Sequence, residues 1–222
     1  MTRNVRTYDH FCLVARALEQ VGERWSLLVV RDLLTGPKRF TDLMDRLGGI
    51  TPKTLSQRLR ELAEVGVVAV DREPGRREVW YQLTEAGREL DPVVDALAGW
   101  GMRHAWRWPL PGEPVHIEHV LGALTQAIEH ATDEHEQARW HLRFPGDEYL
   151  LECDGRHWSL TSTTSTTEAD VTVTAPTDAF IQFLVGRVDA TDPRIDVVGE
   201  PDAVQRFERL VKAFAEVTRR SA

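Results

Sequence analysis

The residues in this sequence whose types suit nucleic-acid chemistry lie in the stretch TPKTLSQRLRELAEVGVV, residues 51–68. Its apolar residues repeat at helical spacing, and at 100° per residue three leucines fall within about 60° of one another: Leu55, Leu59 and Leu62. Lys53, Gln57 and Arg60 occupy the opposite face. Lys and Arg favour guanine acceptors and phosphates, and Gln can bond adenine through two atoms. This face is either a solvated helix surface or a surface that enters a DNA groove.

The start of the same helix offers a second kind of contact. Thr51 is a good N-cap, and Pro52 suits the first helical position. Free amides and the helix dipole at such an end favour a phosphate. We therefore count Thr51, Thr54 and Ser56 among the candidate DNA-binding residues, together with Lys53, Gln57 and Arg60.

The elements that must position this helix come before it in the chain. Helical spacing predicts earlier helices in residues 12–21, 23–36 and 40–49, which end at glycines. The second of them should turn Trp25, Leu28, Val29 and Leu33 inward. The third and the helix after Thr51 are joined by a short turn that contains Gly48 and Gly49. Two helices joined in this way form a helix-turn-helix, whose second helix is offered to a major groove.

A basic hairpin follows the helix pair. Residues 67–72 and 79–83 alternate as strands, and the turn between them, residues 73–78, carries Arg76 and Arg77. Such a wing can reach backbone phosphate or a minor groove. A further helix is predicted over residues 86–105. Arg39 precedes the first helix of the pair and either contacts phosphate or is simply exposed.

Several motifs together resemble the HxlR-type winged-helix transcription regulators. They are Cys12, GERWSLLVVRDLLTGPKRFTDL, ITPKTLSQRLRELAEVGVV and YQLTEAGREL, and the resemblance covers residues 8–105. It implies a homodimer, built from the first helix and the helix after the wing, on a roughly palindromic operator. Family members act as repressors or activators. Cys12 resembles the cysteine that some members use to sense oxidants or electrophiles; the alternative is a small hydrophobic residue at the dimer interface.

Charge and cysteine usage limit the class of protein. The net charge is −8, but residues 1–110 hold 17 Lys and Arg against 15 Asp and Glu, whereas residues 111–222 hold 10 against 20. This asymmetry indicates two modules, and the acidic one should sit away from DNA. Two cysteines make no disulfide framework, and no apolar run reaches the roughly 20 residues of a membrane span. We expect a cytoplasmic protein.

The second half predicts a separate α+β domain. After a Pro-rich linker, residues 106–113, the pattern runs helix, an antiparallel run of strands, helix, strand and helix. The predicted strands cover residues 138–144, 148–155, 156–164 and 169–176. The expected domains are therefore 1–105, for DNA binding and dimerisation, and 114–222.

The run DVTVTAPTDAFIQFLVGRVDATDPRIDVVGEPDAVQRF resembles the sterol carrier protein type 2 (SCP2-like) domain, over about residues 115–217. That resemblance implies a cavity for a lipid or another apolar ligand between an antiparallel sheet and helices, without catalytic residues. The candidate ligand-binding residues are Trp140, Leu150, Trp158, Phe180, Phe183 and Leu184. The alternative is that these side chains only fill a core.

The sequence gives little indication of metal binding or of catalysis. His116 and His119 stand three apart, but no cysteine cluster or His-Glu-x-x-His pattern accompanies them, so we expect neither a metal nor a cofactor. No nucleophile motif, phosphate loop or paired carboxylates indicate an enzyme. We therefore predict a dimeric DNA-binding regulator modulated by an apolar effector. The alternatives are a second domain that serves only for dimerisation or interaction, a thiol-based sensor through Cys12, and a lipid carrier or modifying enzyme with a vestigial DNA module.

Overall fold

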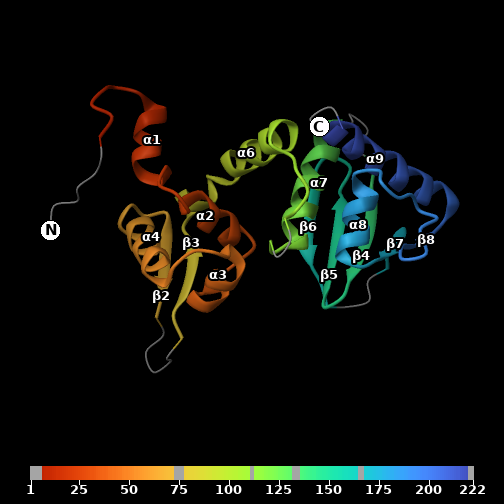
Figure 1. The fold of residues 1–222 in the computed structure, drawn as a ribbon, viewed down its shortest axis with the longest axis horizontal. Helices are drawn as coiled ribbons and strands as arrows, with labels where there is room; N and C mark the ends of the chain where they lie inside the picture. Colours follow the sequence, from red (N-terminus) through yellow and green to blue (C-terminus); the bar gives the residue numbers. More distant parts are fainter. Residues whose placement is uncertain (1–6, 73–77, 111–112, 132–135, 165–167, 220–222) are drawn as a thin grey trace. The chain divides into compact units, whose positions relative to one another are not determined.

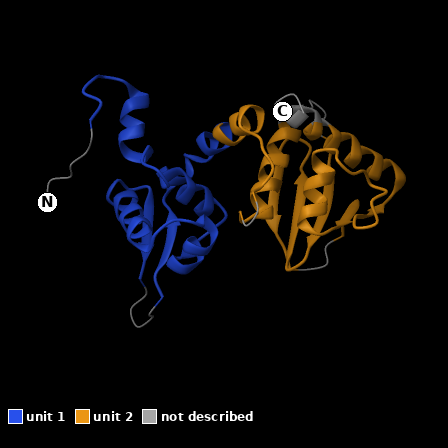
Figure 2. Cartoon of the chain, viewed as in Figure 1, with its two compact units in different colours: residues 1–96 blue, residues 97–222 orange. Residues whose placement is uncertain are grey.

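The computed structural model describes residues 7–72, 78–110, 113–131, 136–164 and 168–219 of the 222-residue chain (Figure 1). The chain forms two compact units, residues 1–96 and residues 97–222 (Figure 2). Helix α6, Asp91–His104, begins in the first unit and ends in the second. The domain limits inferred from the sequence stay predictions.

The first unit is a winged helix-turn-helix. Its described elements are α1 Leu13–Val21, α2 Ser26–Leu34, β1 Lys38–Arg39, α3 Phe40–Leu47, α4 Pro52–Glu64, β2 Val68–Asp71, β3 Trp80–Leu83 and α5 Glu85–Arg88. The strands form an antiparallel sheet in the order β1-β3-β2. Strand β1 was not predicted, because two residues are too few to show alternation. Its Lys38 pairs with Tyr81 of β3 and ties the start of α3 to the wing.

One apolar core holds the first unit together. It joins Val29, Val30 and Leu33 of α2 to leucines of α3 and α4 and to the sheet. The prediction that Leu28 points inward was wrong, since its side chain is 40% exposed. Leu28 lies at the edge of the buried side of α2, where helical spacing alone does not separate buried residues from exposed ones.

The helix predicted over residues 86–105 is two helices, α5 and α6. The break falls between Arg88 and Asp91, and Pro92 then occupies the second position of α6, where its missing N–H costs no hydrogen bond. Gly87 in α5 is required sterically, because a Cβ there would lie 2.2 Å from the Val67 carbonyl oxygen. The short α5 therefore packs directly against the backbone that enters the wing.

The described part of the second unit is a two-layer α+β arrangement, with one sheet and helices packed on it. Its described elements, besides the end of α6, are α7 Ile117–Ala131, β4 Ala138–Phe144, β5 Asp147–Cys153, β6 Trp158–Ser162, β7 Val171–Thr174, α8 Thr177–Leu184, β8 Asp196–Gly199 and α9 Pro201–Arg219. The strand order is β6-β5-β4-β7-β8.

The sheet is mixed, so the prediction of an antiparallel sheet was wrong at one pairing. After β6 the chain crosses to the other side of β4, and β7 runs parallel to β4, with Trp140 opposite Val171. The remaining pairings are antiparallel. Alternation of polar and apolar residues gives the faces of a strand but not the direction of its neighbour, and this limits what the sequence could predict.

Helices α7, α8 and α9 cover one face of this sheet (Figure 1). Alternate residues of the central strands, such as Trp140, Leu142 and Leu151, point into the core that these helices close. Trp106 and Trp108, from the segment predicted as a linker, are half-buried and pack against the same core. The part of that segment that the structure describes is therefore attached to the second unit.

Candidate nucleic-acid interface

The N-terminal end of α4 is capped as the sequence predicts. Thr51 has an extended backbone, and its Oγ1 accepts a hydrogen bond from the backbone N–H of Thr54 at 3.2 Å. The hydroxyls of Thr51 and Thr54 lie 2.8 Å apart. Both threonines are therefore engaged in the cap, and their hydroxyls would share their hydrogen bonds with any phosphate that approaches.

Three of the predicted DNA-binding residues form the exposed face of α4. Lys53, Ser56 and Arg60 are exposed, and none of them forms a hydrogen bond or an ion pair within the part of the chain that the structure describes. Gln57 differs, because it is half-buried and its amide donates to Glu61 Oε1 at 2.9 Å. Gln57 would have to leave Glu61 before it could contact a base.

The opposite side of α4 fixes the rotation of the helix. Its three leucines are buried, as predicted: Leu55, Leu59 and Leu62. Arg58 joins them and is only 8% exposed. Its Nη1 lies 2.7 Å from Glu61 Oε2 and 3.7 Å from Glu23 Oε2. Arg58 was not among the predicted site residues, although its position on the leucine side of the helix indicated that it could be buried.

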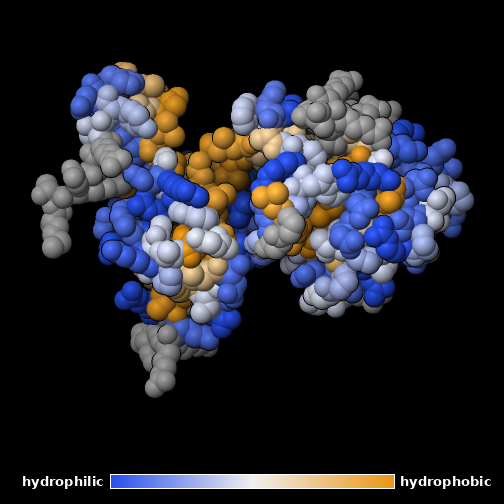
Figure 3. Space-filling view, in the orientation of Figure 1, coloured by the Kyte–Doolittle hydropathy of each residue, from blue (hydrophilic) through white to orange (hydrophobic). Residues whose placement is uncertain are grey.

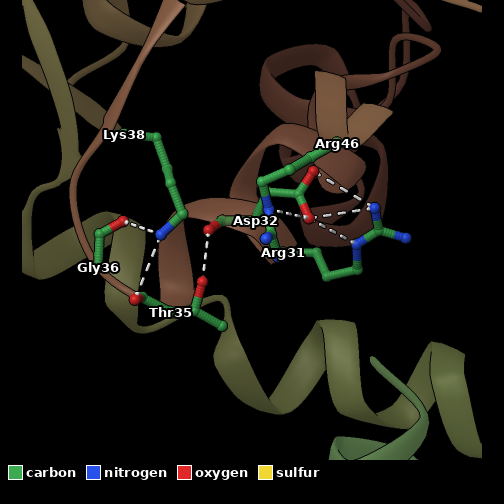
Figure 4. A network of polar contacts seen from close by, with 6 residues as sticks. All are labelled: Arg31, Asp32, Thr35, Gly36, Lys38 and Arg46. Carbon is green, nitrogen blue, oxygen red and sulfur yellow. Dashed lines mark hydrogen bonds and ion pairs between the residues drawn. The ribbon is translucent and has the colours of Figure 1, made fainter. Parts of the chain in front are cut away.

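A buried acid joins the helices that support α4. Asp32 of α2 is fully buried, and its carboxylate lies 3.2 Å from Arg31 Nη2 and 3.7 Å from Arg46 Nε of α3 (Figure 4). The Thr35 hydroxyl donates to the Asp32 carbonyl at 2.9 Å. Lys38 Nζ then donates to the carbonyl oxygens of Thr35 and Gly36, at 3.3 and 3.0 Å. This network ties the end of α2 to α3 and β1, and sequence analysis missed it.

Arg39 is occupied by intramolecular contacts. Its backbone N–H and its guanidinium both donate to Asp42, and Nη1 lies 3.4 Å from Glu78 Oε1. The guanidinium carbon is 5.7 Å from the centre of the Trp80 ring. The hydrogen bond from Arg39 lowers the pKa of Asp42, and the same bond raises the pKa of Arg39. Arg39 therefore caps α3 here, and its contact with phosphate stays a prediction.

The wing is described only at its base. Strands β2 and β3 pair from Val68–Leu83 to Asp71–Trp80. The predicted contacts Arg76 and Arg77 lie outside the described residues. Arg72 directly follows β2 and is exposed. Arg72 was not among the predicted contacts, although it is a basic residue next to the predicted turn.

Comparison with known proteins identifies this unit. A model of the HxlR-like helix-turn-helix family matches residues 20–109. An uncharacterized HTH-type transcriptional regulator of Methanothermobacter thermautotrophicus is 33% identical over 106 residues, which are 47% of this chain and 81% of that protein. The chain belongs to the HxlR-like helix-turn-helix family. The relatives that carry this likeness are named as HTH-type transcriptional regulators.

Other relatives of this HxlR-like chain match the same half. An uncharacterized HTH-type regulator of Mycobacterium tuberculosis is 46% identical over 110 residues, and the match spans 48% of this chain and 66% of that protein, just under two thirds. Among solved structures, the HTH-type regulator ytcD is 36% identical and covers 44% of this chain and all of its own, with a TM-score of 0.41.

Cys12 precedes the matched residues of this HxlR-like protein. It is the N-cap residue of α1, and its half-buried side chain makes no capping hydrogen bond. The structure describes it as a free thiol, as it does the buried Cys153. Its sensing role stays a prediction.

The second unit lies largely beyond the matched residues and holds the predicted ligand-binding residues. Five of the six are buried in one core: Trp140, Trp158, Phe180, Phe183 and Leu184. The rings of Trp140 and Trp158 lie 4.7 Å apart between centres, and those of Phe180 and Phe183 lie 6.3 Å apart. The buried indole N–H of Trp158 has no hydrogen-bond partner within the described ranges.

Leu150 does not join the other five. Side chains alternate along β5, so Leu150 lies on the opposite face of the sheet, across from His141 of β4. His141 is 3% exposed and contacts Glu148 Oε2 at 2.7 Å. Within the described part of the chain, no three His, Cys, Asp or Glu side chains gather as metal ligands. None of the described helices has both the length and the apolar character that a membrane span requires.

Proposed function

We propose that this HxlR-like regulator binds a roughly palindromic operator as a homodimer, with one α4 helix of each protomer in a major groove. The observation that supports this most is the exposed face of α4. Lys53, Ser56 and Arg60 are unpaired in the described structure, while the leucines and Arg58 hold the other side of the helix. Two-fold symmetry would set two such helices about 34–36 Å apart.

The proposed dimer is supported by apolar surfaces on α1 and α6. Leu13 of α1 is 76% exposed, Phe11 just before this helix is 88% exposed, and α6 exposes Leu97 and Trp100. Figure 3 shows hydrophobic side chains at the surface over both helices. Large apolar side chains exposed on a helix mark candidate interaction sites. A second copy of the chain would cover these residues.

The second unit is proposed to sense an apolar effector, as its resemblance to the SCP2-like domain suggests. Its acidic composition keeps it from competing for DNA, since residues 111–222 carry twice as many Asp and Glu as Lys and Arg. The buried, unpaired Trp158 N–H is a donor that a ligand acceptor could satisfy. An effector changes DNA binding only if it binds the two states of the dimer with different affinity.

Arg60→Ala tests the DNA interface. Duplexes selected from a random library by the wild-type protein serve as the probe, and fluorescence anisotropy measures affinity across a series of salt concentrations. We expect Arg60→Ala to weaken binding by about 1–3 kcal/mol, because it removes a base or phosphate contact. Arg209→Ala, which removes an exposed arginine from α9, is the matched control. Unchanged affinity for Arg60→Ala would exclude this residue from the interface.

A further inference from the structure

A cleft of about 630 Å³ lies in the second unit between α9 and the turn that follows α8. It is lined by Phe183, by residues 186–191 and by one side of α9, including Glu208, Val211 and Lys212. Small-molecule sites in proteins usually measure about 300–1,000 Å³. The cleft therefore has room for one compact organic molecule. Of the six predicted ligand-binding residues, Phe183 is the one that lines this cleft.

The floor of the cleft is apolar and rigidly held. Phe183, Val211 and Ala215 line it, and all three residues are buried in the second unit. The Phe183 ring stacks with that of Phe207, at 6.1 Å between centres and an angle of 21°. Since these side chains are fixed by packing, the cleft is preformed for an apolar body.

The turn that forms one wall is ordered by its own hydrogen bonds. Gly186, two residues after the end of α8, has a positive φ of 69°, a conformation that favours glycine. The Arg187 backbone N–H donates to the Gln182 carbonyl at 2.9 Å. Asp189 accepts hydrogen bonds from the hydroxyl and backbone N–H of Thr191, and these bonds lower its pKa. The carboxylate of Asp189 is thus occupied within the turn.

Arg187 is the cation that this wall presents. Its guanidinium carbon lies over the Trp108 ring, 4.0 Å from the ring centre, which is a cation–π distance. A guanidinium held over a ring can still offer the N–H groups at its edge to a bidentate anion. Arg187 has no carboxylate partner in the described ranges. Glu208 and Lys212 also line the cleft, one helical turn apart on α9, where opposite charges offset each other.

We infer that this cleft binds a compact, largely apolar molecule that carries one anionic group. Arg187, supported by Trp108, holds the anion, and Phe183, Val211 and Ala215 contact the apolar body. That this molecule is the effector of a DNA-binding dimer rests on the proposed function; its binding in the cleft does not.

Two fluorescent probes with the same rings test the assignment on the full chain without DNA. They are 8-anilinonaphthalene-1-sulfonate, which is anionic, and N-phenyl-1-naphthylamine, which lacks the sulfonate. We expect one sulfonate probe per chain and about tenfold tighter binding than that of the neutral probe, because a charge-assisted hydrogen bond is added. Arg187→Gln should weaken the sulfonate probe about tenfold and leave the neutral probe unchanged. Arg209→Gln, the control, should change neither.

A second variant tests the location. Ala190→Phe places a large side chain in the cleft and should weaken both probes. Equal affinity of the two probes, or binding that neither Arg187→Gln nor Ala190→Phe alters, would overturn the inference. Circular dichroism checks that each variant is folded, and if Arg187→Gln is not, Ala190→Phe and the comparison of probes decide. A failure here leaves the result for Arg60→Ala intact, so the two proposals fail separately.

Discussion

Arg58 and Arg60 stand two positions apart on α4 and have opposite environments. Arg58 is buried against Glu61 and Glu23, whereas Arg60 is exposed without a partner in the described structure. We expect Arg58→Gln to lower the free energy of unfolding by about 1–2 kcal/mol, because it leaves Glu61 without its ion pair. Arg60→Gln should change it by less than about 0.5 kcal/mol. Urea unfolding followed by circular dichroism measures both, and equal losses would contradict these assignments.

Glu113 gives a prediction for the dependence on pH. Both of its carboxylate oxygens lie 2.7 Å from Arg107 nitrogens, and one also accepts the Leu110 N–H. These hydrogen bonds, that of Arg107 first, lower the pKa of Glu113 from 4.5 to about 2. Because the pKa in the folded state is the lower one, the contribution of this pair to stability is present above pH 4.5 and is lost as pH falls toward 2.

The titration of Glu113 can be measured directly by NMR of its side-chain carboxyl carbon. We expect a midpoint near pH 2 in the wild type and a shift toward 4.5 in Arg107→Gln. Arg103→Gln removes another exposed arginine and should leave the midpoint in place. A midpoint near 4.5 in the wild type would mean that the ion pair does not persist in solution.

At the scale of elements, the Asp32 network sets the relation of α2 to α3. The substitution Asp32→Asn keeps the shape of the side chain but removes the negative charge that lies between Arg31 and Arg46. Removing one partner from a buried ion pair is costly, so we expect Asp32→Asn to destabilise the protein by about 3 kcal/mol. Asp45→Asn, on the exposed side of α3, is the control and should have little effect. Thermal unfolding compares them, and similar melting temperatures would argue against a structural role for Asp32.

The helices of the first unit were predictable, because their apolar residues repeat with a period that points to one core. The break between α5 and α6 was not, since Leu90, Val93 and Val94 continue the helical spacing across it. The steric need for Gly87 depends on Val67, twenty residues earlier, which no local pattern contains. In the second unit the positions of the strands were predictable, but the parallel neighbour of β4 depends on a crossover, which is a property of the whole sheet.

The candidate site, like the fold, was predictable from the sequence only in part. Exposure of Lys53 and Arg60 follows from the side of α4 on which they lie, and the sequence predicts it. Arg39 has one local partner, Asp42, and two partners, Glu78 and Trp80, that the pairing of β1 with β3 brings next to it. Leu150 and Leu151 are adjacent apolar residues of β5, and since side chains alternate, only one of them can face the helices. Residue type alone did not decide these cases.

At the scale of the whole molecule, the proposed dimer makes the most demanding prediction. Leu13→Asp places a charge on the exposed apolar face of α1, where a second chain would bury it. Sedimentation velocity should show the wild type as a dimer of two 25.2 kDa chains and the variant as a monomer. Val198→Asp, which changes an exposed valine on β8, is the matched control and should remain a dimer.

The same variants extend the test to DNA. A dimer binds its second half-site at high effective concentration, so the Leu13→Asp monomer should bind a palindromic duplex about 10²–10⁴-fold more weakly. Its affinity for a single half-site should be unchanged, because α4 is untouched. If Leu13→Asp stays dimeric, the interface lies elsewhere than α1. If it becomes monomeric and still binds the full operator as tightly as the wild type, the two-helix geometry proposed for recognition is wrong, because one α4 would then suffice.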